Sequence, residues 1–171
     1  MWETIAAEAA AESALWESCL LPSHERQLVA VFSPLGPSEH ALGVETIYEG
    51  YLVHYGQPRL FAPSDADTAL LLGDYLYAHG LVHIAESGDV AAVADLAELI
   101  SLCAQARSER RDGDAAAWAG TVALLGAGRL DAARDALRLA GDASPLEAAA
   151  RAAAGDEAVD GALAAHNRLL G

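Results

Sequence analysis

The sequence predicts an all-α protein, and three observations support this fold class. Alanine, the strongest helix former, recurs through the whole chain, whereas aromatic residues make up 6% and β-branched runs are short. Apolar residues recur at intervals of three and four, and Pro and Gly divide the chain into short segments. At 171 residues and 53% hydrophobic, residues 1–171 are expected to form a single-domain bundle of about seven to nine helices.

Three helices are predicted before the elbow at residues 55–59. The first spans Trp2 to Leu20 and ends at Pro22. The second starts at Ser23, whose hydroxyl can cap free amides of the first turn, and continues through Phe32. A Ser-Pro-Leu-Gly-Pro break then precedes a third helix from Ser38 to about His54.

The elbow at Tyr55–Arg59 leads into two longer helices. Its proline disfavours helix at the preceding residue, and its glycine favours a turn. Ser64 or Asp65 can cap the central helix, which ends at Gly88. An amphipathic helix follows from Asp89 to about Arg107.

The last third of the chain, residues 115–171, contains four shorter predicted helices. A charged link at 108–114 precedes them and is interpreted as a solvated loop. The expected ranges are about 115–125, 130–139, 145–153 and 157–170.

Charge and cysteine content limit the possible functions. The formal charge of -15, with ten Arg and no Lys, disfavours nucleic-acid partners and excludes lysine Schiff-base chemistry. Cys19 and Cys103 are expected to be buried, reduced thiols. The N-terminus lacks a basic flank, and the apolar stretch 69–85 is too interrupted for a membrane span, so a cytoplasmic location is expected.

The central third of the chain resembles the trans-polyprenyl diphosphate synthases. Leu52-Val53-His54, Gly56-Gln57-Pro58, the run Leu71-Leu72-Gly73-Asp74-Tyr75-Leu76-Tyr77-Ala78 and the helix ending Ala106-Arg107-Ser108-Glu109 occur in the order of that family's segments. The resemblance covers residues 45–109, with 51–109 as its core. It implies an isoprenoid-synthase-like helical fold and a role in isoprenoid biosynthesis.

The chain departs from this family where the family's chemistry takes place. Family members use clustered aspartates to hold magnesium against an allylic diphosphate, and arginines to bind the second diphosphate. Here His54 leads directly to Tyr55-Gly56, and no D-D-x-x-D motif occurs. Asp65-x-Asp67 and Asp112-x-Asp114 are the nearest substitutes, and the first is better explained as a helix start. We therefore expect no prenyltransferase activity.

No side chain is assigned as catalytic, and Asp74, His79 and His83 are the remaining candidates. His79 and His83 lie four residues apart, and Glu86 is three further on, which suits a two-histidine, one-carboxylate metal site. The sequence identifies no ligand from another helix. Core histidines with hydrogen-bond partners are the alternative interpretation, and Asp74 is expected to be satisfied by a neighbouring Tyr, His or Arg.

Four residues are candidates for ligand binding, namely His54, Tyr55, Arg59 and Tyr75. His54 and Tyr55, together with Tyr48 and Tyr51, cluster at the elbow and could line a pocket mouth. Aromatic packing of a helix end is the alternative interpretation.

Two functional hypotheses follow. The first is a catalytically inactive scaffold or small regulatory subunit without a cofactor, acting as a homodimer or with a catalytic prenyl synthase subunit. By resemblance, the central helix and Val90–Cys103 would form the interface, where Gly73 and Gly80 would permit close helix approach. The alternative is an enzyme or carrier that binds an isoprenoid diphosphate, with magnesium, through Asp74, His79 and His83.

Overall fold

The computed structural model describes residues 1–171 and contains nine α-helices and three 3-10 turns, so the predicted fold class is confirmed. No strand is present, and β-type pairing is confined to one isolated bridge between Leu20 and Phe61. No helix combines the length and the apolarity that crossing a membrane requires. The helices are α1 (Trp2–Glu12), α2 (Ala14–Ser18), α3 (Ala41–Tyr55), α4 (Ala66–Glu86), α5 (Val90–Ser108), α6 (Asp114–Ala123), α7 (Asp131–Ala140), α8 (Ser144–Ala154) and α9 (Asp156–Leu170).

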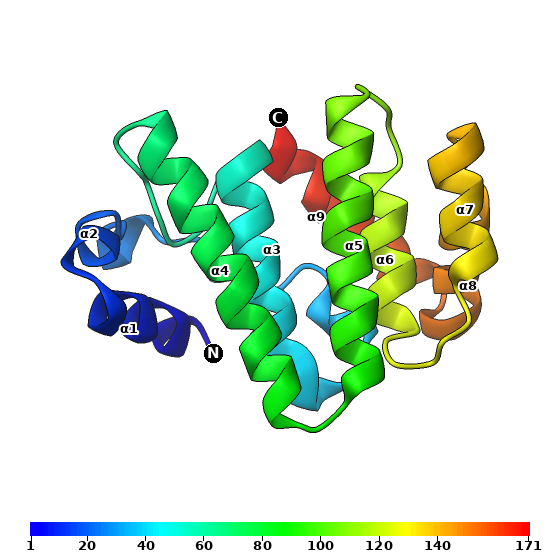
Figure 1. Ribbon diagram of the computed structural model, residues 1–171, viewed down its shortest axis with the longest axis horizontal. Coiled ribbons are helices and arrows are strands. Elements are labelled where there is room, and N and C mark those ends of the chain that lie inside the picture. The colour runs from blue at the N-terminus through cyan, green and yellow to red at the C-terminus, as the bar shows by residue number, and fades with distance from the viewer.

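The helices are arranged roughly in chain order along the longest axis (Figure 1). Helices α1 and α2 form one end, α3 to α6 form the middle, and α7 and α8 form the other end. Helix α9 returns to contact α3 and α6. The larger apolar core is centred on α3, α5 and α6, and a smaller one joins α1 and α2 to α3 and α4. Both cysteines are free and buried in these cores, as predicted.

The first predicted helix, Trp2–Leu20, is broken at Ser13. This residue has extended backbone angles, φ -156° and ψ 135°, and its hydroxyl accepts a hydrogen bond from the amide of Leu15. Serine competes with helical hydrogen bonding through such local contacts, and here it caps α2 instead of continuing α1.

The second predicted helix, Ser23–Phe32, is wrong beyond its first turn. A 3-10 turn ends at Glu25, and the chain then runs without helix to Phe32. Its amides bond to distant partners, since Gln27 donates to the carbonyl of Arg59 and Val31 donates to the carboxylate of Glu45. These tertiary hydrogen bonds replace those that a local helix would have made.

Glycines hold α3 and α4 in the most extensive contact between any two elements. Gly43 lies opposite Gly80, and Gly50 lies opposite Gly73, which makes the pair antiparallel. A Cβ on Gly43 would lie 2.8 Å from the carbonyl oxygen of Gly80, and one on Gly50 would lie 2.9 Å from that of Gly73. The close approach predicted for Gly73 and Gly80 therefore occurs within the chain, not at a subunit interface.

A buried arginine, Arg59, links the elbow to α3 through two ion pairs. The side chains of Arg59, Glu45 and Glu49 are fully buried, and the guanidinium contacts Glu45 at 2.6 Å and Glu49 at 2.9 Å. Glu45 also accepts the amides of Val31 and Ser33. Arg59 thus forms one hydrogen-bonded network with Glu45, Glu49 and, through Glu45, the segment before α3.

We predict that Gly80→Ala lowers the free energy of unfolding by about 2 kcal/mol or more, because the new methyl would meet the backbone of α3. Gly161→Ala in α9 is the control, since a Cβ there meets nothing within 4 Å. The control should gain up to about 1 kcal/mol from helix propensity. Urea unfolding measures both, and equal effects would contradict the close-contact explanation.

Replacing Arg59 should be severely destabilising. Arg59→Met leaves two carboxylates buried without their cation, and we expect a loss of about 3–5 kcal/mol in chemical denaturation. Arg168→Met is the matched control, because Arg168 is exposed and makes no ion pair. It should change stability by less than about 0.5 kcal/mol. A mild effect at Arg59 would show that the ionic cluster does not hold the elbow.

Candidate functional site

Helix α4 presents a different environment on each of its sides. Gly73 and Gly80 face α3, and Tyr77 and Leu81 pack against the larger core. A third side faces α1. The fourth side is open to solvent and carries exposed apolar residues. The candidate residues from the sequence are distributed among these sides and do not form one pocket.

Asp74 lies on the solvent side of α4, with a side chain that is 66% exposed and not buried. The nearest ring nitrogen of His54, Nε2, is 3.3 Å from its carboxylate, so a histidine satisfies this acid, as predicted. The His54 ring packs over Gly73, where a Cβ would collide with it. Burial lowers the pKa of His54 and outweighs the opposing influence of Asp74.

His79 and His83 lie on the side of α4 that faces α1, and the structure supplies a partner that the sequence did not identify. The carboxylate of Glu8, on α1, lies 3.0 Å from Nε2 of His79 and 2.9 Å from Nε2 of His83. One ligand atom from each of the three residues lies within 4.8 Å of the other two. The spacing of the histidines was visible in the sequence, but Glu8 is 71 residues away from His79.

Glu86 takes a different position from the one expected of a third ligand. Its carboxylate lies 3.8 Å from Nδ1 of His83, on the other side of that ring from Glu8. Tyr75 stacks on His79 with ring centroids 5.3 Å apart and on Trp16 at 5.8 Å. Tyr75 therefore supports the ring of His79, whereas Glu86 lies beyond hydrogen-bond distance of His83.

The other ligand-binding candidates are held by neighbouring side chains. Arg59 is bound to its two glutamates and is stacked on the ring of Trp2. Tyr55 is half-buried and packs against Tyr51 and His54, with centroids 5.1 and 5.5 Å apart. This contact agrees with aromatic packing of a helix end, the alternative interpretation for the elbow.

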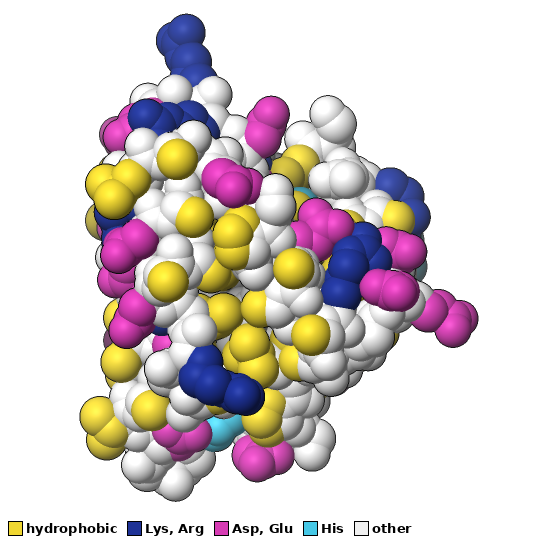
Figure 2. Space-filling model, turned by 90° about the vertical axis from the view of Figure 1, so that its right-hand side faces the viewer, with side chains coloured by type: hydrophobic (Ala, Val, Ile, Leu, Met, Phe, Trp, Pro, Cys, Tyr) yellow, Lys and Arg dark blue, Asp and Glu magenta, His cyan; other side chains and the backbone are white.

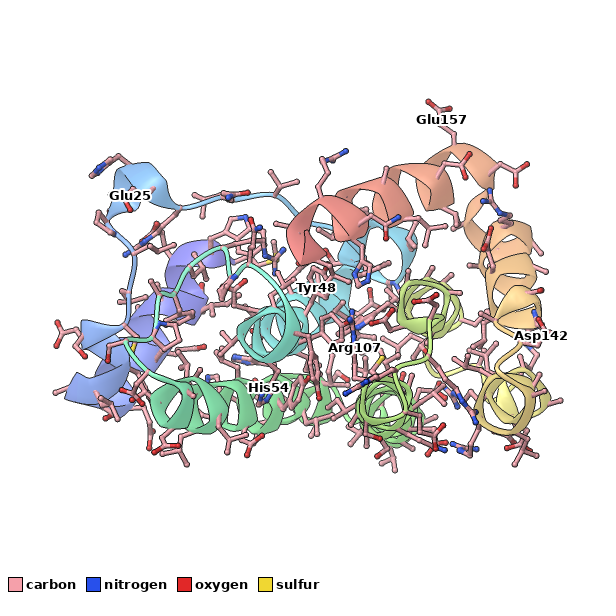
Figure 3. All side chains as sticks on the ribbon, turned by 90° about the horizontal axis from the view of Figure 1, so that it is seen from above. Glu25, Tyr48, His54, Arg107, Asp142 and Glu157 are labelled. Atoms are coloured by element: carbon pink, nitrogen blue, oxygen red, sulfur yellow. The ribbon has the colours of Figure 1, made fainter.

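A polar network inside the bundle was missed by sequence reasoning. Arg107 on α5 donates to the hydroxyl of Tyr51 at 2.6 Å and lies 2.5 Å from the carboxylate of Asp114, which also accepts from Tyr51. Figure 3 shows Arg107 and Tyr48 in the middle of the molecule, away from the peripheral Glu25, Asp142 and Glu157. The sequence predicts a solvated link that includes Asp114, but this residue is buried at the start of α6.

His166 on α9 adds a buried titratable group to this interior. Its Nδ1 lies 2.9 Å from the hydroxyl of Tyr48, and its Nε2 is 4.0 Å from Asp114. The ring also stacks on Tyr51. Burial lowers the pKa of His166 to about 4, because the surrounding aromatic rings cannot solvate an imidazolium.

The surface grooves are polar or shallow. The largest, about 550 Å³ between α5 and α7, is lined mainly by charged side chains such as Asp95 and Arg134. A groove of about 210 Å³ beside Arg59 is small and has a mixed lining, in which Val29 and Leu169 lie beside Gln27 and Gln57. The mainly apolar groove between α6 and α8 has a volume of about 260 Å³ and is walled largely by alanines. These linings offer little to a long isoprenoid chain.

Comparisons with protein-family models, curated proteins and solved structures give no match for this chain. The polyprenyl synthase resemblance therefore remains a prediction from sequence.

We predict that His166 makes stability depend on pH. Because its folded pKa is below the unfolded value, its contribution is complete above about pH 6.5 and is lost as the pH falls towards about 4. Urea unfolding between pH 7 and 4.5 should show this slope in the wild type. His166→Phe should make it shallower, with the remainder coming from groups such as His54, whose pKa is also lowered, and His24→Gln, at an exposed histidine, should leave it unchanged. An unchanged slope in His166→Phe would contradict the assignment.

Proposed function

We propose that this chain acts by helix–helix association, as a catalytically inactive scaffold or small subunit. The observation that carries the proposal is the solvent-facing side of α4 and the adjoining start of α5. Four large apolar side chains on it are 53–79% exposed. They are Leu70, Leu71, Val82 and Val90.

The exposed α4 residues form one continuous surface. At about 100° per residue, the exposed positions 67, 70, 71, 74, 78, 82 and 85 fall within about 120° of the helix circumference. Asp67 and Asp74 are the two charged residues among them, and the exposed positions 90, 91, 94, 97, 101 and 104 of α5 are uncharged. We refer to this surface as the α4–α5 face. Such a face is unusual in a chain with a net charge of -15.

The end of the molecule formed by α7 and α8 has a different character. Figure 2, which looks onto the end formed by α7 and α8, shows acidic and arginine side chains spread among apolar ones. Arg138 pairs there with Asp135 at 2.7 Å, and Arg151 pairs with Glu147 at 2.8 Å and Asp160 at 2.7 Å. These ion pairs favour solvent exposure of that end and leave the α4–α5 face as the better docking surface.

The positions of the acidic residues that could have held magnesium support a chain without prenyltransferase activity. Asp65 caps α4 through the amide of Thr68, and Asp114 is bound to Arg107 and Tyr51. The one group of three His, Cys, Asp or Glu side chains with converging ligand atoms contains Glu8 and two histidines, not an aspartate cluster. An aspartate cluster is what magnesium-assisted ionisation of a diphosphate requires.

The partner is proposed from the resemblance. Polyprenyl synthase subunits join through helices near the G-D-Y-L segment, and here that segment belongs to the helix with the exposed apolar face. A second copy of this chain, or a catalytic prenyl synthase chain, is therefore the proposed occupant. Because the grooves lack long apolar linings, association is favoured over an isoprenoid carrier.

The test compares charged substitutions on and off the face. Leu71→Glu with Val82→Glu should weaken association at least tenfold, because burying two new carboxylates is costly. Sedimentation velocity of the purified chain measures self-association, and affinity purification from native cells at low salt, read by mass spectrometry, measures a heteromer.

Leu139→Glu on α7 is the control, because Leu139 is even more exposed than Leu71 and Val82 but lies away from the face. Wild type and control should form a dimer or recover a polyprenyl synthase chain, and the double variant should do neither. A wild-type chain that stays monomeric and recovers no such synthase would overturn the proposal.

A further inference from the structure

We propose that Glu8, His79 and His83 form a binding site for one divalent transition-metal ion of the Zn²⁺ class, which joins α1 to α4. This site is independent of the α4–α5 face, since it lies on another side of α4. It uses a carboxylate from one helix and two imidazoles from another.

The spacing of the ligand atoms is close to that of a metal site. Metal–ligand bonds of about 2.1 Å place two ligand atoms about 3.0 Å apart at a right angle and about 3.4 Å apart in a tetrahedron. The Glu8 oxygen lies 3.0 Å from Nε2 of His79 and 2.9 Å from Nε2 of His83. Small side-chain rotations would therefore be enough to receive an ion among the three atoms.

The ligand set indicates the class of metal. Two imidazoles and one carboxylate suit Zn²⁺, Co²⁺ or Ni²⁺, whereas Mg²⁺ prefers an all-oxygen shell. An ordinary glutamate side chain is ionised at neutral pH, so Glu8 can supply a carboxylate ligand.

The surroundings hold the ligands in place and leave one side open. Ile5 and Ala9, on either side of Glu8 in α1, are buried in the smaller core. Tyr75 stacks on His79 and supports that ring, while the exposed Glu86 lies 3.8 Å from Nδ1 of His83. His79 is 26% and Glu8 34% exposed, so water can complete the coordination shell.

Binding would stabilise the attachment of α1. The ion replaces hydrogen bonds that two histidines share with one carboxylate oxygen, and it binds only when α1 lies on α4. A ligand that binds only the folded state raises stability by mass action. The expected consequence is a metal-dependent melting temperature.

The test uses the full chain, stripped with chelator and dialysed. Isothermal titration with Zn²⁺ should give one site per chain, Co²⁺ should produce visible absorption bands of a bound complex, and either ion should raise the melting temperature by several degrees. Mg²⁺ at the same concentration should give none of these signals.

Glu8→Gln and His83→Gln should each weaken Zn²⁺ binding at least tenfold, with helical circular dichroism unchanged. His24→Gln is the matched control, because His24 is exposed beside Glu25 and outside the site. If His83→Gln fails to fold, Glu8→Gln decides the question. Absence of Zn²⁺ binding, or binding unaffected by Glu8→Gln, would overturn the proposal without bearing on the α4–α5 face.

Discussion

The glycine contact between α3 and α4 is the constraint on which the other features depend. Gly43 lies opposite Gly80, and Gly50 lies opposite Gly73, so the two backbones approach closely. Any rotation of α4 about its own axis that brought a larger side chain to these positions would cause a clash. At about 100° per residue, the observed orientation of α4 turns the histidine pair towards α1 and the exposed leucines towards solvent. Both proposed surfaces of α4 are thus consequences of four positions without side chains.

Ion pairs between inward-facing arginines and acids are a second feature that determines the fold. In a chain with 25 acids and ten arginines, Arg59 and Arg107 each turn inward and meet acids from other segments. Removing either arginine would leave buried carboxylates uncompensated, which is far more costly than losing a surface pair. These arginines therefore fix the elbow and the start of α6, and they are not free to bind an anionic ligand.

The two functional proposals use different sides of one helix and can be tested separately. Association relies on exposed apolar area, whereas metal binding relies on three converging ligand atoms. A metal at Glu8 would leave the α4–α5 face uncovered, because α1 lies on another side of α4. The resemblance to polyprenyl synthases suggests a partner for the face and gives no precedent for the histidine site, since the family's metal ligands are aspartates.

The sequence alone determined the fold class and the ranges of most helices, because apolar spacing, capping residues and glycine breaks act within a few residues. It also showed that His79 and His83 share a face. Only the tertiary structure decided the features made by distant partners. Residues 26–32 are held without helix by Glu45 and Arg59, Asp114 is buried by Arg107, and Glu8 reaches the histidines from another helix. No local pattern encodes these contacts, because their free energy arises only when separate segments pack together.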